Sequence, residues 1–396
     1  MNVPAKSQKY GVYALYLTCF TCLLSSSLTG FFSVFMIIFW LISGMYKNIP
    51  VILKENSIAV IAIIFCCLLL VGLLYSPASF NDSLEFIKKY RRLLFIPIAL
   101  SLTRNFPNVS RNIINALLLG YAVVLVNAYL VDFNIIEPNS LSLKRKGGGF
   151  LVIFAYLVFQ RTLLEKGHKF IWGIFFLVIL YDFFFLLSTR TGWLIFIGLA
   201  ILFFVQHFSI KKQLVCLVLI VFFGVGVFYS SNSIQKSIYV TLTNLKEYDA
   251  EKKNSRTSLG LRLDWYQNSI ALIKEKPIFG HGTGSFEVVQ KSLIEGKSTM
   301  DTNDPHNEYL LTTVQIGLVG LSVMLLLLID PVVRSFRLLS LKDREHAFAL
   351  QATVLFLVIG CFFNSWLHTS IPGYIFAFLI VAFYPIRDRD ELENIK

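Results

Sequence analysis

Long apolar runs alternate with short polar stretches along almost the whole chain. The runs are about 17 to 22 residues long, which is the length that an α-helix needs to cross roughly 30 Å of hydrocarbon. The pattern therefore predicts an all-α, polytopic membrane protein with about 12 transmembrane helices. The predicted spans are residues 11–28, 30–46, 57–76, 88–103, 112–132, 149–163, 169–188, 192–208, 213–231, 307–329, 347–366 and 372–386. The fourth and sixth are the weakest, because the fourth begins with basic residues and the sixth is short and follows glycines.

Composition supports the membrane assignment. Of the 396 residues, 56% are hydrophobic and only 15% are charged, whereas a soluble domain carries roughly 25% charged residues. The net charge of +12 comes from basic residues scattered between the apolar runs, so no nucleic-acid partner is expected. All six cysteines lie within apolar runs, which argues against a disulfide framework or a thiolate zinc site.

The basic residues predict an orientation. If both termini face the cytoplasm, every cytoplasmic connection carries at least two basic residues, as the positive-inside rule requires. We therefore expect transmembrane helices 1–9 in residues 1–231, a long outward-facing loop in residues 232–306, and transmembrane helices 10–12 with a cytoplasmic tail in residues 307–396. Within the loop, residues 258–277 predict an amphipathic helix that Ser258 can cap, that Pro277 ends and that lies on the membrane or against the bundle.

Three candidate catalytic residues are predicted to share the outward side. Arg190 lies in S-T-R-T-G-W at an outer turn, and Arg262 lies on the helix of the loop. His306 follows Asp304-Pro305, which we expect to be the N-cap and first residue of the next span. Each has an ordinary structural alternative, namely a snorkelling arginine, a solvated helix charge and a histidine in a capping turn.

A glycine-rich stretch, P-I-F-G-H-G-T-G-S-F at residues 277–286, lies between the loop helix and His306. Gly282 and Gly284 are candidates for a backbone nest that binds phosphate, although turn geometry explains them equally well.

A metal site is the weaker alternative. Asp301, Asp304, His306 and Glu308 are close in sequence. However, His306 and Glu308 are only two residues apart and would point to different faces of a helix. We therefore expect neither a metal nor a cofactor.

Four motifs occur in a characteristic order: T-R-T-G-W, S-L-G-L-R-L-D-W-Y, P-I-F-G-H-G-T-G-S-F and D-P-H-N-E-Y-L. Over roughly residues 180–320 the chain resembles the O-antigen ligase and polymerase superfamily of bacterial inner membranes. The resemblance implies metal-independent glycan transfer from undecaprenyl diphosphate on the periplasmic face. In the ligase branch the acceptor is a sugar of the lipid A–core of lipopolysaccharide. It also implies Arg190, Arg262 and His306 as the functional residues.

The chemistry of these side chains agrees with that implication. Breaking a sugar–diphosphate bond builds negative charge on the leaving group, and guanidinium groups bind phosphate oxygens bidentately without a metal. A neutral histidine can take the proton of the attacking hydroxyl. The partners that the resemblance implies are the carrier-linked donor, the lipid A–core acceptor and membrane lipids.

Alternative functions stay open. An O-antigen polymerase or a protein O-oligosaccharyltransferase belongs to the same superfamily, and a lipid-carrier flippase or exporter is a different class. The ligase is preferred because S-L-G-x-R and H-N-E look ligase-like. The flippase is disfavoured because the arginines cluster at one predicted face instead of through the depth of several spans.

Two further charged features have no settled role. The basic residues Lys88, Lys89, Arg91 and Arg92 at the outward start of span four either mark a misplaced span or bind a phosphate of the acceptor or donor. Asp182, inside the seventh span, is expected to pair with a cation of the bundle in preference to a catalytic role.

Overall fold

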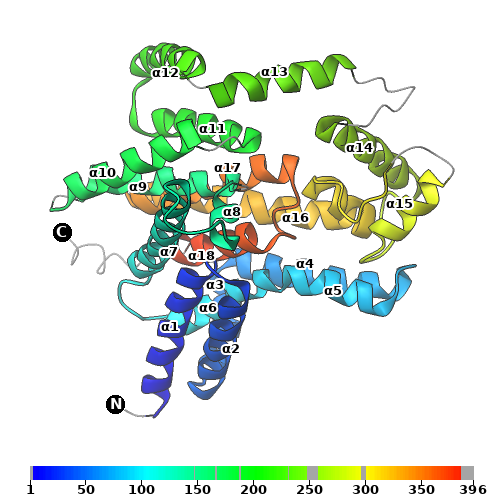
Figure 1. The fold of residues 1–396 in the computed structure, drawn as a ribbon. Coiled ribbons are helices and arrows are strands. Elements are labelled where there is room, and N and C mark those ends of the chain that lie inside the picture. Colours follow the sequence, from blue (N-terminus) through cyan, green and yellow to red (C-terminus); the bar gives the residue numbers. More distant parts are fainter. Residues whose placement is uncertain are drawn as a thin grey trace.

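The computed structural model describes residues 3–146, 148–165, 167–186, 189–230, 232–247, 257–295 and 300–384, and these residues form helices without any strand (Figure 1). The first half contains α1 (Val3–Thr21), α2 (Ser26–Ile42), α3 (Ile49–Glu55), α4 (Ser57–Val71), α5 (Phe80–Tyr90), α6 (Phe95–Thr103), α7 (Val109–Asp132), α8 (Ser140–Lys146) and α9 (Val152–Leu164). The second half contains α10 (Lys169–Tyr181), α11 (Arg190–His207), α12 (Ile210–Ser230), α13 (Asn232–Glu247), α14 (Ser258–Glu275), α15 (Phe286–Ile294), α16 (Glu308–Ser340), α17 (Arg344–Phe363) and α18 (Ser370–Phe383). Short 3-10 turns are η1 (Met45–Asn48), η2 (Gly72–Tyr75), η3 (Arg91–Leu94) and η4 (Gly149–Leu151), and η5 (Asp182–Leu186) is a π turn.

Six helices of the described part are long and apolar enough to cross a membrane. They are Ser57–Tyr75, Val109–Asp132, Lys169–Leu186, Arg190–His207, Glu308–Ser340 and Arg344–Phe363. A seventh span results if the pair Ser26–Ile42 and Met45–Glu55, bent by 78°, counts as one. The all-helical class is thus confirmed, whereas the number of about twelve spans stays a prediction.

The fourth and sixth predicted spans, which are the weakest in the sequence, do not form helices long enough to cross a membrane. The predicted span 88–103 is divided by the 3-10 turn η3 into the end of α5 and the nine-residue α6, so it is not one continuous helix. A run of basic residues at the turn interrupts the apolar pattern there. The predicted sixth and twelfth spans correspond to the shorter apolar helices Gly149–Leu164 and Ser370–Phe383.

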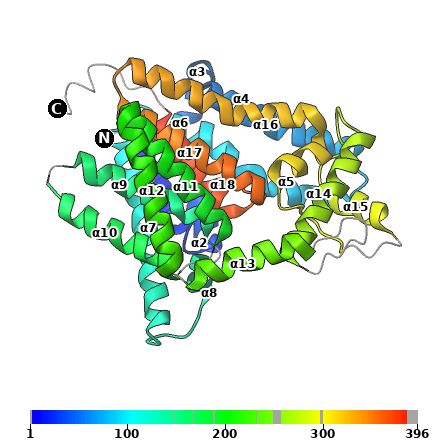
Figure 2. The same cartoon turned by 90° about the horizontal axis from the view of Figure 1, so that it is seen from above.

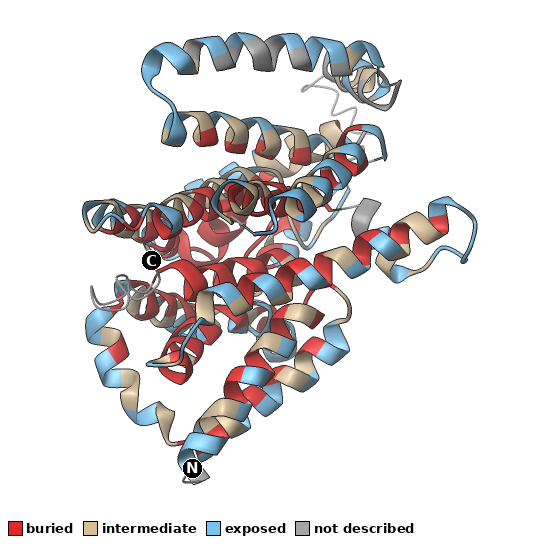
Figure 3. Ribbon diagram, turned by 90° about the vertical axis from the view of Figure 1, so that its left-hand side faces the viewer, coloured by how far each residue is buried: buried red, intermediate tan, exposed pale blue. Residues whose placement is uncertain are grey.

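The buried core lies where the later helices cross the earlier ones. Helix α16 packs against α4 on one side and α17 on the other. Figure 2 shows α4 and α16 side by side, with α14 and α15 gathered at one end and both termini toward the other end. Buried residues concentrate along the central helices (Figure 3), and α18 is buried over nearly its whole length. The end that carries α14 and α15 therefore holds the segment predicted to face the periplasm.

Helix α16 is broken inside the bundle. Ile316 and Gly317 have non-helical backbone angles, and Gly317 has a φ of 66°, in the region that favours glycine. The glycine-rich segment 277–282 fills this break and supplies the missing backbone partners. Before the break, the N–H groups of His281 and Gly282 donate to the carbonyls of Val314 and Gln315, both at 2.8 Å. After it, the N–H groups of Leu318 and Val319 donate to the carbonyls of Pro277 (2.8 Å) and Ile278 (3.3 Å). The break is tolerated in an apolar bundle because its backbone N–H and carbonyl groups are hydrogen-bonded.

Candidate active site

Helix α14 supplies one wall of the site. Its N-cap is Thr257, whose hydroxyl accepts the N–H of Gly260 at 3.1 Å, so the helix begins at Ser258 without that residue being the cap. The helix ends at Glu275, two residues before Pro277, much as the sequence predicts. It lies against α16, which brings its aromatic residues to the turn that opens that helix.

The turn before α16 differs from the predicted cap. Asn307 is the N-cap, because its side chain accepts the N–H of Leu310 at 3.0 Å and the helix begins at Glu308. Asp304 instead accepts the N–H of His306 at 2.7 Å in a tight turn. His306 lies in the left-handed region with a φ of 55°. The prediction that Asp304 caps the span was therefore wrong, since Asn is as good an N-cap and stands next to the helix.

His306 lies where α14, α16 and the end of α17 meet. Its ring is 5.3 Å from that of Trp265 on α14, and its Nδ1 is 3.1 Å from the Oδ1 of Asn364, the C-cap of α17. Tyr266 donates its hydroxyl to the carbonyls of His306 (3.2 Å) and Phe362 (2.9 Å). Three segments far apart in sequence thus hold this histidine in place.

Arg262 belongs to the same wall. It precedes Trp265 by three residues, about one helical turn, so both lie on one side of α14. Burial raises the pKa of the Tyr266 phenol above its ordinary value, and a hydrogen bond with Asn307 and the nearby Arg262 guanidinium offset only part of this rise. The structure therefore brings Arg262 close to the residues that hold His306.

Arg190 is exposed at the first turn of α11. That turn packs closely on η4, because a Cβ added to Gly149 would lie 3.1 Å from the backbone nitrogen of Gly192. The next residue of η4, Phe150, has its ring 6.5 Å from Trp366, beside Asn364. Within the described residues, Arg190 is connected to the histidine through these neighbours and not by a direct contact. The residues just before it, 187 and 188, lie outside the described part.

Gly282 and Gly284 are used for close packing. The N–H of Gly282 donates to the carbonyl of Gln315 and that of Gly284 to the Gln315 side chain, at 2.8 and 2.5 Å. A Cβ on Gly282 would lie 2.4 Å from the Cα of Ser76, and one on Gly284 would lie 2.6 Å from the Cα of Ser83. These N–H groups already have protein partners, which favours the turn explanation over the phosphate nest.

The cations at the start of predicted span four are not equivalent. Lys88, Lys89 and Arg91 are exposed, and Lys88 pairs with Glu85. Arg92 is buried, with its Nη1 donating to the carbonyl of His368 at 3.1 Å. Its guanidinium carbon also lies 5.3 Å from the centre of the Tyr374 ring. The exposed three are available to an anion, whereas Arg92 ties η3 to the segment between α17 and α18.

Asp182 is fully buried in the π turn η5. The turn and residues 187–188 separate it from α11, so it does not share one regular helix with Arg190. Its role as a partner for a bundle cation stays a prediction.

The sequence does not predict the buried polar cluster around Glu308. Glu308 is fully buried and accepts hydrogen bonds from the Tyr90 hydroxyl (2.6 Å) and from the N–H groups of Leu367 (2.9 Å) and His368 (3.2 Å). Burial lowers the pKa of His368 to about 3, with further lowering from the charges of Lys89 and Arg92. The sequence signal was N-S-W-L-H, a polar break between two apolar runs on the predicted outer side.

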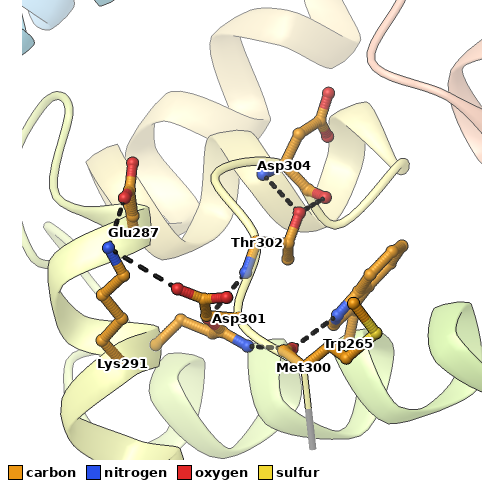
Figure 4. Close-up of polar contacts among 8 residues, drawn as sticks. Trp265, Glu287, Lys291, Met300, Asp301, Thr302 and Asp304 are labelled. Atoms are coloured by element: carbon orange, nitrogen blue, oxygen red, sulfur yellow. Dashed lines mark hydrogen bonds and ion pairs between the residues drawn. The ribbon is translucent and has the colours of Figure 1, made fainter. Parts of the chain in front are cut away.

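Asp301 and Asp304, two residues of the alternative metal site, contact other groups of the protein. Lys291 lies between Glu287 and Asp301, at 2.6 and 3.6 Å from their carboxylates (Figure 4). Thr302 donates its hydroxyl to the carbonyl of Asp304 at 2.8 Å. In the ranges that the structure describes, no three His, Cys, Asp or Glu side chains are grouped as metal ligands.

Comparisons with known proteins agree with the motif order. Residues 174–325, which include Arg190, Arg262 and His306, match the protein-family model described as O-Antigen ligase. The chain is also similar to an uncharacterized protein of Haemophilus influenzae, with 29% identity over 257 residues. That alignment covers 61% of this chain and 64% of the relative, so the match spans less than two thirds of the relative's length. From α10 into α16 the chain is therefore similar to the O-antigen ligase family.

Proposed function

We propose that the protein is an O-antigen ligase that transfers a glycan from undecaprenyl diphosphate to a sugar hydroxyl of the lipid A–core. The reaction takes place on the periplasmic face of the inner membrane and needs no metal. The family match supports the reaction class. The observation that carries the proposal is that α14, the helix that bears Arg262, contacts the His306 turn through Trp265 and Tyr266.

The proposed reaction exchanges one bond for another at the anomeric carbon of the donor sugar. The acceptor hydroxyl oxygen attacks this carbon, and the bond from the carbon to the phosphate oxygen breaks. The electron pair of the broken bond leaves with undecaprenyl diphosphate, and the hydroxyl proton passes to a ring nitrogen of His306. A positioned base of this kind contributes about 10²- to 10⁴-fold to a rate.

The arginines stabilise the leaving diphosphate in this proposal. A guanidinium stays charged and presents a planar pair of donors that matches phosphate oxygens. Arg262 lies one helical turn before Trp265, whose ring contacts that of His306, and Arg190 stands at the positive end of the α11 dipole, where an anion is favoured. The two therefore bind the diphosphate from different sides.

A deletion strain tests the overall reaction. Loss of long chains from the lipid A–core, with carrier-linked polymer retained, supports the ligase. Core that bears a single repeat indicates a polymerase instead, and loss of glycan from proteins indicates an O-oligosaccharyltransferase. Carrier-linked polymer trapped on the cytoplasmic side would indicate a flippase or exporter and overturn the proposal.

A purified assay tests the residues. We expect alanine at Arg190, Arg262 or His306 to abolish transfer without loss of folded protein, and chelator to leave wild-type transfer intact. Arg262→Lys should keep less than about a tenth of the rate, because an ammonium cannot form the bidentate contact. Lys274→Ala, an exposed cation on the same helix, is the control and should transfer normally. Near-normal transfer by Arg262→Ala would exclude the diphosphate contact.

A further inference from the structure

The hydrogen bond between His306 and Asn364 determines which ring nitrogen carries the proton. The Oδ1 of Asn364 accepts the backbone N–H of Ser365 at 3.0 Å. A backbone N–H is always a donor, so the atom that it meets must be the amide oxygen and not the amide nitrogen. The same oxygen lies 3.1 Å from the Nδ1 of His306. An oxygen only accepts, and Nδ1 must therefore be the protonated nitrogen.

This assignment leaves Nε2 as the basic nitrogen. A neutral imidazole carries one proton, and a proton on Nδ1 leaves the Nε2 lone pair available to accept another. His306 is partly exposed, and among the residues that the structure describes its Nε2 has no hydrogen-bond partner. The ring is therefore in the form that a base needs, with its free nitrogen not occupied by the protein.

The carboxylate of Asp304 joins the segment that carries His306 to the segment that carries Asn364. Asp304 Oδ1 accepts the N–H of His306 at 2.7 Å and the hydroxyl of Ser365 at 2.6 Å. Asn364 is further anchored because its N–H donates to the carbonyl of Gly360 at the end of α17. The distance from the amide oxygen to the ring is thus set by bonds on both the α16 and the α17 side.

We propose that Asn364 is a positioning residue that holds His306 in the Nδ1–H form, so that Nε2 takes the proton of the acceptor hydroxyl. The inference rests on the proposed function for the identity of that hydroxyl. The form of the ring, however, is a property of the protein alone. It can be measured without any substrate.

The first test is spectroscopic. The full-length protein is labelled with ¹⁵N-histidine, placed in lipid nanodiscs and studied by NMR at a pH where the ring is neutral. The His306 signals are assigned by their loss in His306→Gln. We expect a protonated Nδ1 and an unprotonated Nε2 in the wild type, and loss of this single form in Asn364→Leu. A wild-type His306 protonated on Nε2 would overturn the inference.

The second test is kinetic and compares two substitutions at one position. Asn364→Leu removes the acceptor, and we expect kcat to fall about 10- to 100-fold, the range known for hydrogen bonds that orient metal-bound histidines. The KM for the donor should stay unchanged. Asn364→Asp keeps an oxygen for both N–H donors and should restore most of kcat. Equal losses in the two variants would mean that Asn364 only supports the fold.

The pH profile gives a readout that a purely structural role would not change. The ionisable groups nearest the ring are Asp304 in its own turn, Arg262 on α14 and the buried Glu308 two residues after His306, and all three are the same in every variant. The carboxylate in Asn364→Asp stabilises the imidazolium, so the acidic limb of the rate profile should move to higher pH. An unmoved limb would contradict the proposal. If the wild type transfers no glycan at all, the proposed function fails while the NMR result still decides the form of His306.

Discussion

Tyr90 donates its hydroxyl to the carboxylate of Glu308 at 2.6 Å, which joins the end of α5 to the first residue of α16. The same carboxylate accepts two N–H groups of the segment between α17 and α18. One buried side chain therefore holds three parts of the chain together immediately beside His306.

Replacing Glu308 by alanine should destabilise the protein strongly. The change leaves three buried donors without an acceptor, and each such group costs about 1–3 kcal/mol. We expect a loss of at least about 3 kcal/mol, measured by denaturant unfolding in detergent. Glu137→Ala, at an exposed position outside the helices, is the control. An unchanged midpoint in Glu308→Ala would show that the bonds contribute little.

Gly317→Ala should prevent the break in α16 from forming correctly. A Cβ there would lie 2.0 Å from the carbonyl oxygen of Ile278, and the positive φ is unfavourable for alanine. Since the contact is backbone, it cannot move aside like a flexible side chain. We expect a large drop in folded protein, measured by size-exclusion chromatography and thermal unfolding. Gly30→Ala, with nothing within 4 Å of the added Cβ, should behave like the wild type.

The stability of the protein should depend on pH through His368. Its pKa in the folded state is about 3, below the usual value of 6.5, because the ring is buried against Phe86 and Tyr90. The unfolded chain therefore binds a proton below pH 6.5 that the folded chain does not. The stabilisation is present above pH 6.5 and is lost as the pH falls toward 3, by about 2 kcal/mol at pH 5. His368→Gln should remove this part of the slope between pH 7.5 and 5, and an identical slope would refute the assignment.

The exposed cations beside the site should act on substrate binding. Neutralising Lys88, Lys89 or Arg91 should raise the apparent KM for the acceptor by about fivefold per charge, and the effect should shrink at high salt. Arg92→Gln should instead lower the amount of folded protein, because its guanidinium is buried against Tyr374. The kinetic expectation requires that the cluster faces the periplasm. Cysteines at positions 88 and 89 that react only from the cytoplasm would exclude it.

The sequence predicts the helices better than their interruptions. Hydropathy and caps place α14 to within two residues of its observed end. They do not reveal the break at Ile316 and Gly317, because the partners of its backbone groups come from a segment about 40 residues earlier. Nor do they reveal the turn η3, where Arg92 is buried against residues far along the chain. Such breaks depend on tertiary hydrogen bonds, which no local pattern of apolar residues encodes.

The candidate site divides in the same way. Arg262 and His306 could be selected from the motifs, and in the structure the helix that bears Arg262 contacts the turn of His306 through Trp265 and Tyr266. The residues that support this site could not be predicted from the motifs. Asn364 and Glu308 gain their roles only when α17 and α5 fold against the start of α16, and neither contact leaves a spacing in the sequence.

The break in α16 has a consequence for how the protein enters its membrane. The N–H and carbonyl groups on either side of the break find their partners in residues 277–282, which are synthesised before α16. Unpaired backbone groups are not tolerated in hydrocarbon, so the turns of α16 around the break cannot be completed there until this segment has docked. Docking of this segment and integration of the helix must then finish together. A chain with a defective glycine-rich segment would stall at that stage and be presented to membrane proteases as a partly inserted intermediate.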